Sequence, residues 1–205
     1  MNEFLIVTIG GILTASAAMA GNLDVPIVDD ASMVLEASQN DWRGFYAGGM
    51  IGFNSGDYAY ESGAGGAALE GQTFGAFAGY NVQFDAFVLG GELSYAGGSV
   101  HDVRPGLEIT NYSDVLDIKA RAGYSLGSTL VYGFAGYSNA TWDNFGNTVT
   151  AATGMNYGAG IDILISESMF VGVEYITRDM TSDLGNGNSQ IGTLSTFNVR
   201  VGVNF

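Results

Sequence analysis

The chain has no cysteine and few basic residues: six lysines and arginines stand against 21 aspartates and glutamates among 205 residues. Without cysteine, disulfides and thiolate metal sites are excluded. The net charge of −15 leaves no basic surface for phosphates, which argues against a nucleic-acid partner. Charged residues form 13% of the chain, about half the share typical of soluble domains. Glycine, with 32 residues, is about twice as frequent as usual.

The N-terminal residues predict an export signal. The longest apolar run ends in Ala18-Met19-Ala20, a small-x-small pattern that is typical of signal cleavage. A transmembrane anchor is the alternative, but the run is short and contains Gly10 and Gly11, which disfavours an anchor. The expected organisation is a signal peptide at 1–20, a polar and acidic periplasmic segment at 21–41 and one domain at 42–205.

Beyond the signal, the sequence predicts strands. No later stretch has the roughly 18 to 20 uncharged apolar residues that a spanning helix needs. Near the C-terminus, apolar residues alternate with polar or small ones, and this period of two is typical of a strand with one apolar face. A membrane protein without helices must form a closed barrel, because open sheet edges leave backbone groups unpaired in hydrocarbon. The last strand looks like the C-terminal assembly signal of outer-membrane barrels, at Val199, Val201, Val203 and Phe205.

Alternating runs of about ten residues predict eight antiparallel strands after Trp42. Tight connections alternate with long ones, as in outer-membrane barrels with short periplasmic turns and longer extracellular loops. Both termini are then expected on the periplasmic side. The expected strands are 43–54, 72–84, 87–97, 114–126, 129–140, 155–165, 169–179 and 194–205. The tight connections are near 85–86, 127–128 and 166–168, and the long ones are near 55–71, 98–113, 141–154 and 180–193.

The alternating faces also indicate what surrounds the barrel. A soluble, lipocalin-like barrel with an apolar interior is the alternative, but its exterior would carry abundant Lys and Glu. The polar face here is mostly Gly, Ser, Asn and Thr, which fits a crowded interior better. Aromatic residues near both strand ends fit the girdles of a membrane barrel. We expect Phe45, Phe84, Phe87, Phe170 and Phe205 at one rim and Phe53, Phe74 and Tyr95 at the other.

Six short motifs follow one another along the domain. They are Asp41-Trp42-Arg43-Gly44-Phe45-Tyr46-Ala47-Gly48-Gly49, Gly79-Tyr80-Asn81-Val82-Gln83, Gly91-Glu92-Leu93-Ser94-Tyr95, Lys119-Ala120-Arg121-Ala122-Gly123-Tyr124, Val173-Glu174-Tyr175 and Val199-Arg200-Val201-Gly202-Val203-Asn204-Phe205. In order and spacing they resemble the small OmpA-like, opacity-type surface barrels of Gram-negative outer membranes, often labelled porin family. The resemblance covers 42–205 and implies an eight-stranded barrel with a role at the cell surface and in envelope integrity.

If the apolar faces point to lipid, four acidic and four basic residues face the interior. An eight-stranded barrel is just wide enough for its own side chains, and an isolated buried charge is costly. We therefore expect these residues to form a network of ion pairs that plugs the interior. A narrow or gated pathway for ions or small solutes is the alternative. The eight residues are Glu92, Asp117, Lys119, Arg121, Asp162, Glu174, Arg178 and Arg200.

Few residues are suited to catalysis or to metal binding. His101, the single histidine, precedes Asp102 in a predicted loop, and a triad with Ser99 or Ser113 is conceivable, but sequence adjacency does not supply triad geometry. The acidic and amide residues at 183–188 miss the spacing of a calcium loop. We therefore expect no enzymatic activity, no metal and no cofactor, with an envelope-lipid enzyme as the third alternative.

The long connections are acidic, so we expect a solvated, repulsive surface with no direct attraction to lipopolysaccharide phosphates. Bridging by divalent cations is the alternative, and any binding specificity would reside in these loops. The expected protein is a monomeric, structural barrel in the outer membrane of a Gram-negative bacterium. Its expected partners are outer-membrane lipid, lipopolysaccharide and, through the C-terminal strand, the barrel assembly machinery. The acidic residues at the outer face are Asp57, Glu61, Glu70, Asp102, Glu108, Asp114, Asp143, Asp179 and Asp183.

Overall fold

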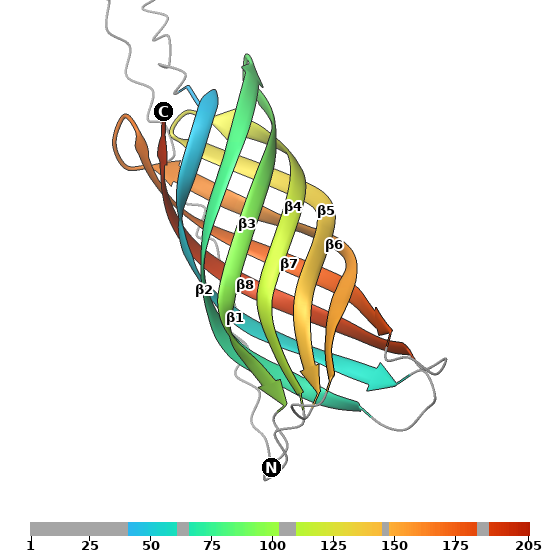
Figure 1. The fold of residues 1–205 in the computed structure, drawn as a ribbon. Helices are drawn as coiled ribbons and strands as arrows, with labels where there is room; N and C mark the ends of the chain where they lie inside the picture. Colours follow the sequence, from blue (N-terminus) through green and yellow to red (C-terminus); the bar gives the residue numbers. More distant parts are fainter. Residues whose placement is uncertain (1–40, 61–65, 103–109, 145–147, 184–188) are drawn as a thin grey trace, which may run out of the picture. The chain divides into compact units, whose positions relative to one another are not determined.

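Eight antiparallel strands of 15 to 19 residues make up most of the described structure (Figure 1). The computed structural model describes residues 41–60, 66–102, 110–144, 148–183 and 189–205. The predicted signal peptide at 1–20 and nearly all of the segment at 21–41 lie outside these residues and stay predictions. Within them, no helix is long and apolar enough to cross a membrane. The strands are β1 (Gly44–Tyr60), β2 (Gly66–Phe84), β3 (Phe87–Asp102), β4 (Thr110–Leu126), β5 (Thr129–Asn144), β6 (Thr148–Leu164), β7 (Met169–Asp183) and β8 (Ser189–Asn204).

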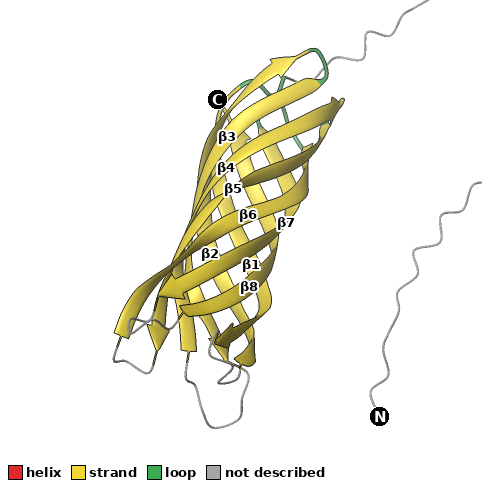
Figure 2. Cartoon of the chain, turned by 90° about the vertical axis from the view of Figure 1, so that its right-hand side faces the viewer, coloured by secondary structure: helices red, strands yellow, loops and turns green. Residues whose placement is uncertain are grey.

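The strands close into a barrel, because β1 pairs with both β2 and β8. Figure 2 shows them winding obliquely around it. A path that starts at Gly44 and follows the cross-strand partners once around the barrel returns to β1 at Asn54. The pairing is therefore offset by ten residues per turn of the barrel. An offset of about 33 Å over a circumference of about 38 Å tilts the strands by about 40°. Eight strands at this tilt leave room for little more than their own side chains.

The tight connections lie where the sequence predicts them, between β2 and β3, β4 and β5, and β6 and β7. In the second of these, Gly127 adopts a φ of 66°, in the left-handed region that favours glycine. We call the rim that carries these turns the turn end and the opposite rim the loop end.

At the loop end the strands are longer than predicted. β1 continues to Tyr60 and β3 to Asp102, so parts of the predicted long connections are strand. The prediction was wrong there because it followed apolar residues, and the outward positions of these extensions are polar. Ser55, Asp57 and Glu70 are examples of exposed polar residues in the extensions. Alternation of exposed and buried positions nevertheless continues through Ser55 to Tyr58.

The outward face carries an apolar band between two aromatic rims. At the turn end, Phe45, Phe84, Phe87 and Phe205 are 60–79% exposed. On β1 the rims are eight residues apart, from Phe45 to Phe53, which is about 26 Å of strand and about 20 Å along the axis at this tilt. That height approximates the apolar band of a membrane barrel. The rim toward the loop end consists of Phe53, Phe74, Tyr95, Tyr137, Tyr157, Tyr175 and Phe197.

Phe170 does not belong to the turn-end rim, and that prediction was wrong. It is 1% exposed because it shares the alternation phase of Glu174 and therefore points inward. Inside the barrel its ring centroid lies 6.1 Å from those of both Trp42 and Phe77. The interior therefore holds large aromatic rings beside the small and polar residues that predominate on the inward face.

Inward glycines accommodate these large rings. A Cβ atom on Gly160 would lie 2.4 Å from Cζ of Tyr132, and one on Gly202 would lie 2.4 Å from Cζ of Phe170. Both distances are well inside van der Waals contact, so a side chain at either position would displace a ring. Part of the high glycine content thus serves to pack aromatic rings in a narrow interior.

Candidate functional site

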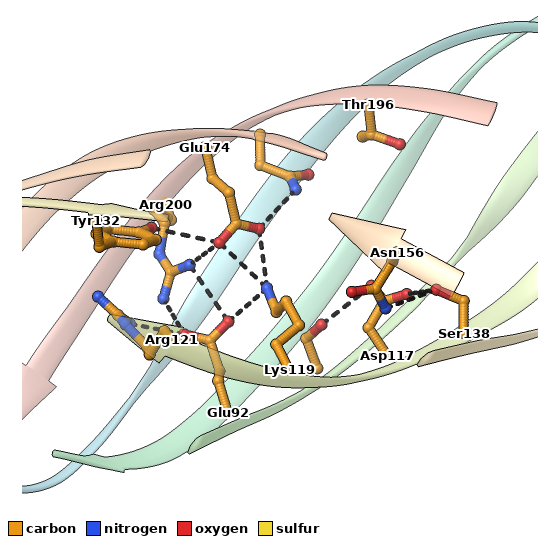
Figure 3. A network of polar contacts seen from close by, with 12 residues as sticks. Glu92, Asp117, Lys119, Arg121, Tyr132, Ser138, Asn156, Glu174, Thr196 and Arg200 are labelled. Atoms are coloured by element: carbon orange, nitrogen blue, oxygen red, sulfur yellow. Dashed lines mark hydrogen bonds and ion pairs between the residues drawn. The ribbon is translucent and has the colours of Figure 1, made fainter. Parts of the chain in front are cut away.

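Six charged side chains meet near the middle of the barrel. With two tyrosines they form what we call the central cluster. Figure 3 shows Glu92 and Glu174 on opposite sides of Lys119 and Arg200. Three carboxylates face three cations, so the cluster has no net charge. Its members are Tyr46, Glu92, Lys119, Arg121, Tyr132, Asp162, Glu174 and Arg200.

Arg200 and Lys119 each bridge the same two glutamates. Arg200 donates from Nη2 to Oε2 of Glu92 at 2.6 Å and from Nη1 to Oε2 of Glu174 at 2.7 Å. Nζ of Lys119 lies 2.6 Å from Oε1 of Glu92 and 2.9 Å from Oε1 of Glu174. The four residues come from β3, β4, β7 and β8, so the ion pairs join strands on different sides of the barrel.

Arg121 extends the cluster through both ion pairs and ring contacts. Its Nη1 donates to Glu92 at 3.0 Å and its Nη2 to Asp162 at 3.1 Å. Nη1 also donates to the Tyr46 hydroxyl at 2.9 Å, and that hydroxyl donates to Glu92 at 3.0 Å. The guanidinium carbon lies 3.8 Å from the ring centroid of Tyr132, a cation–π geometry. Hydrogen bonds and a ring face therefore offset the cost of burying this charge.

A second cluster lies closer to the loop end, around a bidentate ion pair. Arg178 donates from Nε and Nη2 to the two carboxylate oxygens of Asp117 at 2.9 and 2.7 Å. Asp117 also accepts from Ser138 at 2.6 Å and from Ser94 at 3.2 Å. Nη1 of Arg178 donates to Thr196 at 2.7 Å. Further hydrogen bonds join Asn54, Thr73 and Asn156 to this cluster.

Apolar layers lie on either side of the two clusters. The turn-end layer comes from inward residues at the start of their strands or just before, and the loop-end layer from inward residues near the opposite strand ends. Solvent reaches at most 5% of each of the eight charged residues. The turn-end layer contains Trp42, Val88, Leu130 and Phe170. The loop-end layer contains Tyr58, Leu69, Val100, Val115, Ala140, Ala152, Met180 and Leu194.

The structure places all eight charged residues of the predicted network inside the barrel, six in the central cluster and two in the second. Sequence reasoning missed their polar partners, among them Tyr46, Tyr132, Ser138 and Thr196. The signal available in the sequence was the alternation along each strand. A residue that is an even number of positions from an inward residue on the same strand also points inward.

Most of the other candidate residues cannot be compared with these clusters, because their side chains lie outside the described part of the structure. His101 and Asp102 belong to β3 instead of a loop, and their side chains, like that of Ser99, are outside the described part. Ser113 belongs to β4, and 184–188 of the rejected calcium-loop segment are not among the described residues. In the parts of the chain that are described, no group of three His, Asp or Glu residues could hold a metal ion.

The residues of the predicted C-terminal signal lie on the outward side of β8 or directly after it. Val199 and Val201 are each 47% exposed and Phe205 is 79% exposed, while Val203 is partly buried. The backbone N–H of Phe205 donates to the carbonyl of Phe45 at 2.8 Å. The strand that carries the predicted assembly signal therefore completes the barrel against β1.

A closed barrel with an outward apolar band defines the class, a β-barrel membrane protein. The family described as outer membrane protein beta-barrel domain matches residues 13–205, and the chain belongs to this family. It is thus an outer-membrane protein of Gram-negative type, as predicted, and the soluble lipocalin-like alternative is wrong.

Relatives and a solved structure agree with this assignment. The 22 kDa outer membrane protein of Rhizobium leguminosarum bv. viciae is 30% identical over 167 residues, covering 72% of this chain and 70% of the relative. The 25 kDa outer-membrane immunogenic protein of Brucella abortus biovar 1 is 28% identical over 178 residues, covering 82% and 81%. Neisserial surface protein A (NspA) has the same fold, with a TM-score of 0.52 at 14% identity, covering 78% of this chain and 97% of that one.

Proposed function

We propose that this protein is a structural barrel of the outer membrane whose interior is closed by its two charge clusters. The observation that carries the proposal is the sequence of layers in the interior. Ion-paired charges, each at most 5% exposed, lie between two apolar layers. An ion that crossed would have to pass both apolar layers and break ion pairs between them, and both steps cost several kcal/mol (about 3–5 for a broken buried pair).

A narrow channel for ions or small solutes is the second candidate. It is favoured by one observation, the eight charges that line the interior at mid-height. The central cluster holds its cations by paired contacts, such as Arg200 to both Glu92 and Glu174. Conduction would therefore require a rearrangement of several ion pairs at once. Single-channel recording separates the two candidates.

In this proposal the turn end faces the periplasm, with both termini, and the loop end projects from the cell. The length of the strands supports the loop-end assignment, since exposed polar residues such as Asp57, Glu70 and Asp179 continue past the aromatic rim. A relative in Brucella is named immunogenic, which supports surface exposure here. Antibodies raised against a peptide of residues 103–109 should label intact cells. Labelling that requires permeabilised cells would contradict this orientation.

The envelope role has its own test. Deleting the gene should increase the sensitivity of the bacterium to a detergent and to a large hydrophobic antibiotic, and the wild-type gene should restore resistance. An unchanged sensitivity would contradict a structural role. Because the role needs no catalysis, a His101→Ala gene should restore resistance as well as the wild type does, and failure to do so in a folded variant would favour the enzyme alternative.

Partner proposals follow from the outward surface. Lipid contacts the apolar band, and the barrel assembly machinery recognises the C-terminal strand through its outward residues and Phe205. The protein acts as a monomer and needs neither cofactor nor metal. Lipopolysaccharide surrounds the loop end without a direct basic contact from the loop-end parts of the strands. The exposed charges there, Asp57, Glu70, Asp114, Asp179 and Asp183, are all acidic.

A further inference from the structure

A polar recess lies at the turn end of β1 and β2, away from the interior clusters. It has a volume of about 240 Å³ and is lined by Asp41, Arg43, Gln83 and Asp85. Arg43 donates from Nε and Nη2 to the Asp41 carboxylate at 2.7 to 3.0 Å. Nη1 of Arg43 has no partner in the described ranges, and the side chain is 63% exposed. The recess thus offers free guanidinium donors beside two carboxyl groups.

Both carboxyl groups matter for the charge of the recess. Hydrogen bonds from the Arg43 side chain hold the pKa of Asp41 below its ordinary value, so this group is ionised at neutral pH. Asp85 is an exposed carboxylate in the β2–β3 turn. With one cation and two anions the recess has a net charge of −1. It therefore repels a purely anionic ligand but suits one that carries both signs.

An apolar groove of about 580 Å³ lies on the outward face of β1 to β4. Ala47 and Ala78, which are cross-strand partners, form its shallow middle. Phe45 and Tyr80 also pair across the strands, with ring centroids 4.8 Å apart, and bound the groove toward the turn end. The remaining wall includes Gly91, Leu93, Ile118 and Phe205. The groove is continuous with the lipid-facing band, so its natural occupant is hydrocarbon.

The recess and the groove are neighbours on the same strands. Arg43 lies directly before β1, two residues ahead of Phe45, so the two Cα atoms are at most about 7 Å apart, and both side chains are exposed. Asp85 directly follows Phe84 at the end of β2. Polar groups at headgroup level therefore adjoin an apolar groove at acyl-chain level.

We propose that this surface binds one zwitterionic phospholipid, with its phosphate at Arg43, its ammonium group at Asp41 and Asp85, and an acyl chain in the groove. The primary ammonium of an ethanolamine headgroup can donate hydrogen bonds to both carboxylates. A choline headgroup cannot donate, and a glycerol headgroup carries no cation. The site therefore selects ethanolamine lipids over choline and glycerol lipids with the same chains. This site is independent of whether the interior conducts.

Native mass spectrometry of the detergent-purified full chain tests the proposal. The protein is mixed with equal amounts of phosphatidylethanolamine, phosphatidylcholine and phosphatidylglycerol with identical acyl chains. We expect at least fivefold more retained phosphatidylethanolamine than either other lipid. R43Q and D85N should each remove this preference, and because both residues are exposed, the variants should fold. A shift between boiled and unboiled samples on a gel checks folding.

Two further variants separate the groove from ordinary annular lipid. A78L fills the groove and should lower retention of phosphatidylethanolamine severalfold. A159L is the matched control, because Ala159 lies in a smaller outward groove of about 280 Å³ with Ile161 and Phe197, and it should leave the preference unchanged. Equal retention of the three lipids by the wild type, or an unchanged preference in R43Q and D85N, would overturn the proposal and leave annular lipid only.

Discussion

Replacing Arg200 by methionine removes one of the two cations that bridge Glu92 and Glu174. The central cluster then retains two cations, Lys119 and Arg121, against three carboxylates. Breaking a buried ion pair from one side typically costs about 3–5 kcal/mol, because the remaining charge is left without compensation. Methionine is flexible and apolar and can pack on Phe77, where the guanidinium carbon lies 3.9 Å from the ring centroid, so the cavity contribution is small. We therefore expect a loss of about 3–5 kcal/mol in the free energy of unfolding.

The assay is equilibrium urea unfolding of the barrel refolded in micelles, followed by tryptophan fluorescence. Trp42 is a suitable reporter because it is 2% exposed within the turn-end layer. Refolding in micelles also keeps any effect on cellular assembly out of the measurement, which matters because Arg200 lies among the proposed signal residues of β8.

A charge-balancing variant serves as the control. Adding Glu174→Gln to Arg200→Met restores two cations against two carboxylates, so we expect the double variant to regain part of the lost stability. Ordinary surface substitutions change the free energy of unfolding by up to about 0.5 kcal/mol. A difference between the single variant and the wild type below this value would refute the network as a determinant of stability.

Three further predictions concern other parts of the barrel. Asp117→Asn should cost about 3–5 kcal/mol in the same assay, because it leaves the buried Arg178 unpaired; an unchanged midpoint would contradict the second cluster. Gly48→Ala should destabilise by about 1–3 kcal/mol, since its Cβ would lie 2.1 Å from the Val201 carbonyl oxygen, whereas the outward Gly49→Ala, with its nearest atom at 3.7 Å, should not. Equal effects of the two alanines would be inconsistent with this packing. Phe205→Ala should lower the amount of barrel assembled in cells but not refolding in micelles; normal assembly in cells would argue against the proposed signal.

Much of the fold follows from the alternation of apolar and polar residues. The phase of each strand predicts that Glu92, Asp162 and Arg200 point inward, and all three side chains are buried in the barrel. The tight turns were correctly placed because Asp85-Ala86 and Gly127-Ser128 interrupt the alternation. Phe170 shows the limit of composition as a guide. Its aromatic character suggested a membrane rim, whereas its phase, shared with Glu174, correctly indicates the interior.

The individual ion pairs of Asp117, Lys119 and Arg178 could not be predicted, because height inside the barrel depends on register. Because pairing around the barrel is offset by ten residues, residues at equal distances from the ends of their own strands can lie at different heights. Asp117 and Lys119 are two residues apart on β4, yet Asp117 joins Arg178 in the second cluster and Lys119 joins Glu92 in the central one. The extensions of the strands at the loop end were missed for a related reason, since only burial distinguishes a polar strand from a loop there.

The most direct test of the closed interior is single-channel recording of the folded protein in planar bilayers. A gel shift between boiled and unboiled samples first establishes that the barrel has formed. With ion pairs and apolar layers in place, we predict no conductance steps from the wild type over a wide range of voltage. Reproducible ion-selective steps, altered by changing Arg200 or Glu92, would contradict the closed interior and establish the channel.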